Sequence, residues 1–500
     1  MRGGRWLLLL AAGLVAFGAG APALDARPGG GESFGAPGGG GGGGDDGLIY
    51  FFFRIWLEIV IRYPAFGVPA TIVMLFLVWR HRKARAGGVD EVWDSAPPRP
   101  VPAPTHRHYD FDPLIRHDEH FSPALFDDFA YALFAKAHGA RSRPENLEAL
   151  APYLSDGVRR HLAERQPRGA EVSRVLVGAM RLTFLDVPAS PDSGTVQANL
   201  EFEANLSLRA PDGAAMTRYV RERWLLRRRA DVTSRPPESQ SDFGCPNCGA
   251  PYVATAEHRC AYCHEIVTDG RFDWNVQQIV VLDSRDRPPT LRGVVPEKGT
   301  HLPTIYQPAL ESKVRAFFRE APTQAGGEVE AFSRRFGLVY HDLNLAWSEL
   351  DLAKARPYLT DSLFDYLHFW TEAYRVQGLR NVLDAFRITR WEFVKIRRDA
   401  HFDAITLRFW ATGRDSVVEV ATGRVVGGDP NRERPYSEYW TFIRGRGVTG
   451  SASAERRCPN CGAAHDINMA GECGHCGTNI TRGDFDWVLS KIEQDEAYGR

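Results

Sequence analysis

The chain has 500 residues, of which 44% are hydrophobic and 25% charged, and its formal net charge is −1. This is ordinary globular composition, with length for about three domains. A charge so close to zero excludes a global attraction to nucleic acid or anionic membranes. The eight cysteines are few for this length and lie in two clusters, which argues against a disulfide-rich secreted scaffold.

The N-terminus has the layout of a signal peptide or a retained signal anchor over residues 1–23. Arg2 and Arg5 precede the apolar run Trp6–Phe17, and small residues follow. Residues 24–47 are rich in glycine and offer nothing to bury, so they predict a flexible linker.

Two membrane-associated helices are predicted next. Arg54, Glu58 and Arg62 are four residues apart and form one polar stripe, so residues 48–62 favour an amphipathic helix lying on the membrane surface. Residues 63–79 carry no charge and predict a transmembrane helix, with a buried core helix as the alternative. A basic run follows at once, so the positive-inside rule places everything after about residue 86 in the cytoplasm.

Beyond a basic, Pro-rich linker over residues 80–118, the sequence repeats itself. Pro152-Tyr153-Leu154 returns 205 positions later, Glu222 and Trp224 return 216 positions later as Glu438 and Trp440, and the cysteines return 213 positions later. The repeat predicts a first body at 119–240, a first ribbon at 241–284, a linker at 285–327, a second body at 328–450, and a second ribbon with a C-terminal helix at 451–500.

Each body predicts two helices followed by long strands. Residues 195–208 alternate strictly between polar and apolar side chains, and Ala404–Trp410 repeats the pattern, which is typical of an antiparallel sheet with one buried face. Ser155 and Thr360 are good N-caps for the second helix of each body. The sequence therefore predicts an α+β fold, with helices on a curved sheet. The predicted apolar helix faces consist of Phe126, Phe129, Leu133 and Ala137 in the first body, of Phe336, Val339, Tyr340, Leu343, Trp347 and Leu350 in the second, and of Leu363, Phe364, Leu367, Trp370 and Tyr374 in its next helix.

The cysteines form two pairs of Cys-x-x-Cys knuckles, and eleven residues separate the knuckles in each pair. Two facing knuckles supply four thiolates in a closed tetrahedral site, the arrangement of structural zinc. Gly249 and Gly462 permit the positive φ that such a turn can require. We therefore predict two structural Zn²⁺ ions, held by Cys245, Cys248, Cys260 and Cys263 in the first ribbon and by Cys458, Cys461, Cys473 and Cys476 in the second.

Three other uses of these cysteines are less favoured. Redox pairs need fewer knuckles, a rubredoxin-like iron site usually has more Pro and Gly around its second knuckle, and a catalytic zinc needs an open coordination position. Each ribbon is complete without the nearby histidines, which we expect to lie on the surface: His258, His264, His465 and His475.

No catalytic motif stands out, and we predict that the protein is not an enzyme. His341 and Asp342, with Asp361, would form an acid–base group, but a helix histidine beside an apolar face is more often structural. A basic strand around Trp224 would contact RNA or lipid headgroups, although a solvated edge strand is favoured. Its arginines are Arg221, Arg223, Arg227, Arg228 and Arg229.

Residues 328–447, with Leu352–Asp361, Ala404–Trp410 and Tyr436–Phe442, resemble the Tim44-like domain, the C-terminal domain of a mitochondrial inner-membrane import translocase subunit that also occurs in bacterial membrane proteins. Residues 119–232 resemble it more faintly. The resemblance implies nuclear-transport-factor-2-like cones, a bacterial inner-membrane location, and a tethering role toward translocase components and a chaperone motor. It implies no catalytic residue.

We therefore expect a membrane-anchored adaptor or scaffold with a protein partner, linked to protein translocation or to assembly of membrane complexes. One alternative is a carrier or enzyme that binds a small apolar ligand or lipid in the cone pocket. The other is RNA or ribosome binding through the ribbons and the basic strand, which the neutral net charge makes the less favoured.

Overall fold

The computed structural model of the chain describes residues 109–165, 170–190, 194–239, 242–255, 259–286, 299–320, 328–448, 457–464, 466–495 and 498. The predicted signal segment, Gly-rich linker and two membrane helices lie outside these residues. Within the described ranges, no helix is long and apolar enough to cross a membrane.

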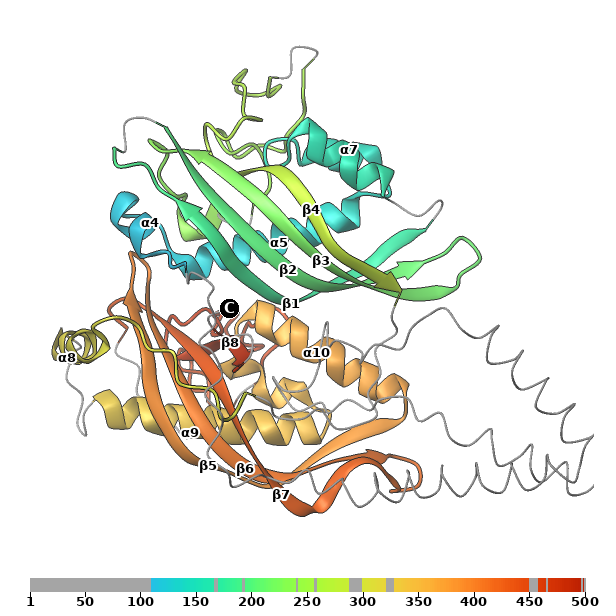
Figure 1. Cartoon of the computed structure of the whole chain (residues 1–500), viewed down its shortest axis with the longest axis vertical. Helices are drawn as coiled ribbons and strands as arrows, with labels where there is room; N and C mark the ends of the chain where they lie inside the picture. Colours follow the sequence, from blue (N-terminus) through green and yellow to red (C-terminus); the bar gives the residue numbers. More distant parts are fainter. Residues whose placement is uncertain are drawn as a thin grey trace, which may run out of the picture. The chain divides into compact units, whose positions relative to one another are not determined.

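The described residues form two halves with the same order of elements, as the sequence repeat predicts (Figure 1). In each half, helices are followed by three long strands, and a fourth strand comes after the cysteine segment. The first half comprises α4 (Asp112–His117), α5 (Pro123–Ala140), α6 (Pro144–Ala149), α7 (Asp156–Glu164), β1 (Glu171–Asp186), β2 (Thr195–Arg209), β3 (Ala215–Arg229), η1 (Pro237–Ser239) and β4 (Asn275–Asp286). The second half comprises α8 (Leu310–Glu320), α9 (Glu328–Ser348), η2 (Leu352–Tyr358), α10 (Asp361–Val376), β5 (Leu379–Arg398), β6 (Phe402–Glu419), β7 (Val425–Gly445) and β8 (Val488–Gln494).

Each half contains one antiparallel four-stranded sheet, with the strands in sequence order. The alternation predicted for β2 is confirmed, because the apolar side chains from Val196 to Leu208 are at most 1% exposed and face the helices. The pairs β1–β2 and β5–β6 each contain three register shifts. Such bulges bend a sheet and strengthen its twist, so both sheets curve. The predicted α+β class is confirmed.

The predicted C-terminal helix is wrong, because Val488–Gln494 form strand β8, which pairs with β7. The apolar residues Val488, Leu489 and Ile492 are spaced in a way that fits a helix or a strand. Pairing with a strand that ends more than forty positions earlier decides between them. The first ribbon range likewise ends in a strand, β4.

Two regions predicted as linkers contribute to the cores. Residues 109–118 include α4, and its neighbour Phe111 packs against Phe121 and Phe126. The region 285–327 includes α8, whose Phe317 lies 6.4 Å from Trp487 between ring centroids. Each half therefore begins with a helix that covers part of its own core, earlier than the sequence repeat alone indicates.

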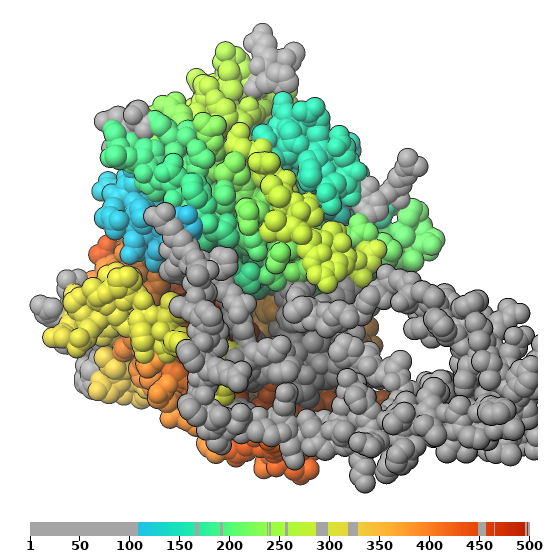
Figure 2. Space-filling model, viewed as in Figure 1, coloured from blue at the N-terminus to red at the C-terminus, as the bar shows by residue number. Residues whose placement is uncertain are grey.

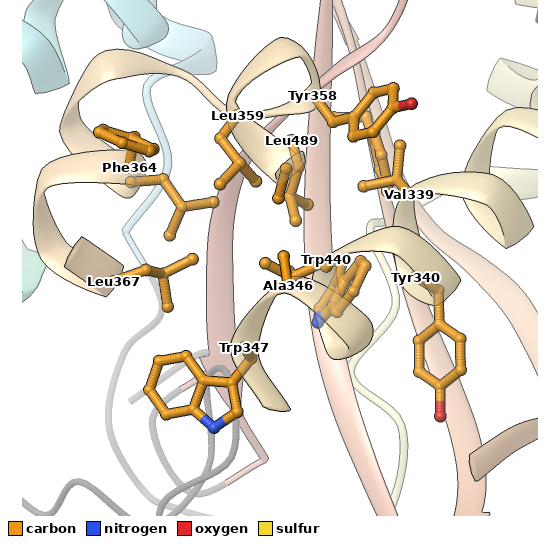
Figure 3. Packing of buried hydrophobic residues seen from close by; sticks show 14 of the residues in the cluster. Val339, Tyr340, Ala346, Trp347, Tyr358, Leu359, Phe364, Leu367, Trp440 and Leu489 are labelled. Carbon is orange, nitrogen blue, oxygen red and sulfur yellow. The ribbon is translucent and has the colours of Figure 1, made fainter. Parts of the chain in front are cut away.

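The core of the second half lies between α9, α10 and the sheet. In Figure 3, Tyr340 and Ala346 of α9 lie near Trp440 of β7, while Phe364 and Leu367 come from α10. All the residues predicted for the apolar faces are buried in both halves. The predicted N-terminal positions are also confirmed: α7 follows Ser155, whose Oγ accepts a hydrogen bond from Val158 N at 3.4 Å, and α10 follows Thr360.

Candidate metal centres

The eight cysteines lie in two groups of four, as the spacing predicts, and the sulfur atoms of each group lie within 4.8 Å of one another. In the first group, sulfur–sulfur distances are 3.8 Å for Cys245–Cys263 and 4.0 Å for Cys248–Cys260. In the second group they are 3.8 Å for Cys458–Cys476 and 3.9 Å for Cys461–Cys473.

These distances fit a shared metal ion and not a disulfide. All eight cysteines are free, and a disulfide would place its sulfurs about 2.05 Å apart. Four sulfurs at about 2.3 Å from a tetrahedral ion lie about 3.8 Å apart, which is close to the distances observed. The residues therefore suit a four-thiolate metal site, and a bound ion would have all its tetrahedral positions filled by protein.

The knuckles are built on backbone turns with positive φ. Gly249 N and Gly462 N each donate to the carbonyl of the first cysteine of their knuckle, with φ of 75° and 73°. The second knuckle of the second ribbon ends with Gly477 at φ 70°. The corresponding residue of the first ribbon is His264 at φ 62°, a left-handed conformation that a residue with a Cβ seldom adopts.

Each ribbon is inserted between the third and fourth strands of its sheet. The first ribbon leaves after β3 and the chain returns at Trp274, which is 3% exposed and lies 5.1 Å from Phe126 between ring centroids. Trp487 occupies the same place before β8, 5.4 Å from Phe332. Behind each tryptophan lies a buried arginine, Arg228 or Arg444. A metal ion that closed the ribbon would therefore also constrain where the fourth strand begins.

The first ribbon packs on the turn before α7. Cys245, Tyr252, Cys260 and Val267 form a small apolar cluster with Ala151. Tyr153 adds a polar contact, because its hydroxyl donates to the Gly244 carbonyl at 2.9 Å, directly before the first cysteine. Figure 2 places this ribbon on the surface of the first half, next to α7.

The candidate acid–base residues are not brought together. His341 is exposed and its ring lies 5.7 Å from that of Phe386, whereas Asp342 is buried and accepts a hydrogen bond from Tyr358 at 3.0 Å. Asp361 pairs with Arg356. These three side chains therefore have separate structural partners. Of the four histidines expected on the surface, His264 and His475 are exposed, and His258 and His465 fall outside the described residues.

The basic strand is not an edge strand, contrary to the interpretation favoured from the sequence. It is β3, which pairs with β2 on one side and β4 on the other. Arg223 donates to Glu201 at 3.2 Å, and Arg221 lies 3.8 Å from the same carboxylate. Arg228 is fully buried against Asp118, and Arg229 pairs with Asp231. Neighbouring acids therefore offset most of its positive charge.

A buried polar cluster inside the first half was missed by sequence reasoning. His138 is 0% exposed, and its Nε2 lies 3.2 Å from Glu222, which also accepts from Trp224 Nε1 at 2.9 Å. Arg141 Nη1 lies 3.1 Å from the other ring nitrogen. Burial raises the pKa of Glu222, but His138 and the hydrogen bonds outweigh it, so the pKa lies below its ordinary value. Glu222 is therefore a buried carboxylate.

The second half keeps the glutamate–tryptophan pair but changes its partner. Trp440 Nε1 donates to Glu438 at 2.8 Å, and Gln494 of β8 donates to the other carboxylate oxygen at 3.3 Å. The sequence alone contained a pattern that could have indicated these buried glutamates. Glu222 and Glu438 stand at inward positions of alternating strands, where a charged side chain needs a buried partner.

The interior of the second half is filled by aromatic rings. Phe336, Tyr340, Phe409 and Trp440 lie with centroids 5.1 to 6.4 Å apart. A pocket at the end of β5, β6 and β7, beside Phe386 and Tyr436, has a volume of about 10 Å³, which holds about one water molecule.

Comparison with protein families gives a match to the Tim44-like domain over residues 324–453. The second half of this chain contains a Tim44-like domain. The match begins just before α9 and ends after β7, so the ribbon and β8 lie beyond it. The first half has the same order of strands around a second set of four cysteines.

Two further comparisons add little to this. A solved structure described as an "Ntf2 like protein involved in plasmid conjugation" is similar at 8% sequence identity and a TM-score of 0.18, over 74% of this chain and 96% of that one. A comparison with curated proteins finds no match.

The strained knuckle of the first ribbon gives a first prediction. Replacing His264 by glycine should raise the free energy of unfolding by about 1 kcal/mol, because glycine adopts positive φ without a Cβ penalty. Urea unfolding of the metal-loaded protein measures the change. The matched control, Gly477→His at the corresponding turn of the second ribbon, should lower it. Stabilities that move in the same direction would contradict this explanation.

The buried cluster gives a second prediction. His138→Leu should destabilise the first half by about 3 kcal/mol, because it leaves the Glu222 carboxylate buried without its main partner. Denaturant unfolding measures the loss. The double variant His138→Leu/Glu222→Leu removes the charge as well, and it should recover most of the lost stability. Equal losses in both variants would mean that packing, not the buried charge, controls this site.

Proposed function

We propose that this protein is a non-enzymatic adaptor of the bacterial inner membrane, which presents two Tim44-like domains to a protein partner in the cytoplasm. Residues 63–79 are its proposed anchor, and the positive-inside rule supports the cytoplasmic side for everything after residue 86. By analogy with the family, the partner belongs to a machine for protein translocation or for assembly of membrane complexes.

The packed interior of the Tim44-like half carries the non-enzymatic part of the proposal. Aromatic rings fill the space between α9 and the sheet, and the pocket at the strand ends is about the size of one water molecule. The three candidate acid–base residues have different partners. The ring of His341 lies beside that of Phe386. Asp342 accepts a hydrogen bond from Tyr358, and Asp361 pairs with Arg356. A packed body of this kind is suited to binding a partner at its surface.

Structural zinc is the proposed occupant of both cysteine clusters. The four-thiolate donor set and the sulfur–sulfur distances of 3.8 to 4.0 Å favour a soft tetrahedral ion. Zinc brings no redox chemistry. Its proposed role is to hold the two knuckles of each ribbon together in a segment that has few apolar residues of its own.

Metal content and stability test this assignment. Native mass spectrometry of the full chain should find two zinc ions, and Cys461→Ser/Cys476→Ser should leave one. Chelation should lower the melting temperature, because the connection between the third and fourth strands loses its closure. A metal-free wild-type protein with an unchanged melting temperature would count against a structural metal.

The adaptor role is tested by crosslinking in native membranes. A photo-reactive residue at Val376 (85% exposed) or at Tyr262 (60% exposed) should capture one specific protein in an amount comparable to the bait. Unirradiated membranes are the control. Recovery of only the bait from both positions, in repeated experiments, would argue against an adaptor.

A further inference from the structure

The two ribbons are attached to their halves in different ways, and the difference centres on Arg356. This residue lies in η2, directly before α10, and is 1% exposed. Its guanidinium donates to the Leu359 carbonyl at 3.0 Å and to the Asp361 carboxylate, and it stacks 4.7 Å from the Phe364 ring. These contacts fix the first turn of α10.

The same guanidinium reaches into the second ribbon. Nε and Nη2 of Arg356 donate to the Met469 carbonyl at 3.1 and 3.0 Å. Met469 belongs to the loop between the two cysteine knuckles. Thr481, just beyond the second knuckle, donates to Asp361 at 3.1 Å. A buried arginine and the first acid of α10 are therefore both bound to parts of the ribbon that a metal ion would hold in place.

The first half makes the corresponding helix contacts through an arginine that lies inside the helix. Arg159, inside α7, donates to the Leu154 carbonyl and to Asp156, both at 2.7 Å. Leu154 and Asp156 correspond to Leu359 and Asp361 at the 205-residue offset. The position of Arg356 is taken by Ala151, a methyl group in the apolar cluster of the first ribbon, and that of Arg159 is taken by Phe364.

The arginine has thus changed places between the halves. In the first half it comes from the helix, where it donates to the helix turn and pairs with Glu148, and its described interaction with the ribbon is electrostatic, with Tyr252. In the second half it comes from the preceding turn and bridges α10 and the ribbon loop. Because a buried guanidinium needs its acceptors, loss of the Met469 carbonyl would leave Arg356 partly unsatisfied and loosen the turn that it holds.

We propose that metal binding at the second ribbon and the seating of the α10 N-terminus are coupled through Arg356, whereas the first ribbon and α7 are not coupled in this way. Loss of metal from the second ribbon would then loosen the N-terminus of α10, the helix that covers the core of the Tim44-like half. Arg356 acts as a positioning residue for both. This inference rests on the proposed metal assignment.

Hydrogen exchange of the full-length chain tests the coupling. With Cys461→Ser/Cys476→Ser, the amide of Phe364, which donates to the Thr360 carbonyl, and the amides that follow it in α10 should exchange about tenfold faster, which corresponds to the loss of one hydrogen bond to a charged group. The matched variant, Cys248→Ser/Cys263→Ser, should change exchange at the start of α7 clearly less, because the first ribbon contacts the turn before α7 through apolar packing and Tyr153 and not through a buried arginine. Unchanged exchange in α10 after metal loss from the second ribbon would overturn the proposal.

A variant that copies the arginine position of the first half into the second half, called the transplant below, distinguishes loss of coupling from a general loss of stability. Arg356→Ala/Phe364→Arg should restore the contacts to Leu359 and Asp361 from inside the helix, as Arg159 does, while removing the link to Met469. Its α10 should no longer respond to metal loss, and a chelator should remove zinc from the second ribbon about tenfold faster than in the wild type. A transplant that responds as the wild type does would also overturn the proposal.

Metal counting distinguishes failure of this inference from failure of the metal assignment. Two bound zinc ions in the wild type, with no response of α10 to their removal, would leave the assignment intact and reject the coupling. A wild type without bound metal would reject both, and Arg356→Ala with wild-type zinc release would reject the coupling independently of the cysteine variants.

Discussion

The position of the ribbons within the sheets is the constraint on which the architecture depends. A strand that must pair with β3 or β7 can do so only after the chain has left the sheet, formed the ribbon and returned. The excursion is long, and a long unconstrained loop opposes closure through its conformational entropy. Four thiolates bound to one ion would shorten the effective loop. Trp274 and Trp487 then mark where the chain re-enters the core.

The buried polar contacts follow from the same repeat but have diverged. Both halves keep a glutamate whose carboxylate accepts from the tryptophan two residues later. A further partner is His138 on a helix in one half and Gln494 on the fourth strand in the other. An inward carboxylate tolerates either solution, because what it requires is a donor and not a particular element. The hydrogen-bond partners of the buried glutamate could therefore change while the order of the strands stayed the same.

The sequence predicted features with local signals and missed those that depend on distant pairing. The alternation of β2, the N-cap at Ser155 and the cysteine spacing are each readable within a few residues, and each is confirmed. The fourth strand β8 was predicted as a helix, because its short apolar pattern fits both periods and only β7 decides between them. The role of Arg356 was invisible for the same reason, since its acceptor Met469 lies 113 positions away.

The two ribbons share a metal-binding frame but not a surface. The first exposes Val253 and Tyr262, at 52% and 60%. At the 213-residue offset the second has Asp466 and His475, both exposed. The second ribbon exposes Met469 instead, at 57%, so the exposed apolar side chains lie at different positions in the two ribbons. Since the cysteine spacing is the same in both ribbons, a requirement for metal binding does not explain why their exposed residues differ. The duplicated halves therefore have ribbons with distinct surfaces, one of which is joined to its domain through a buried arginine.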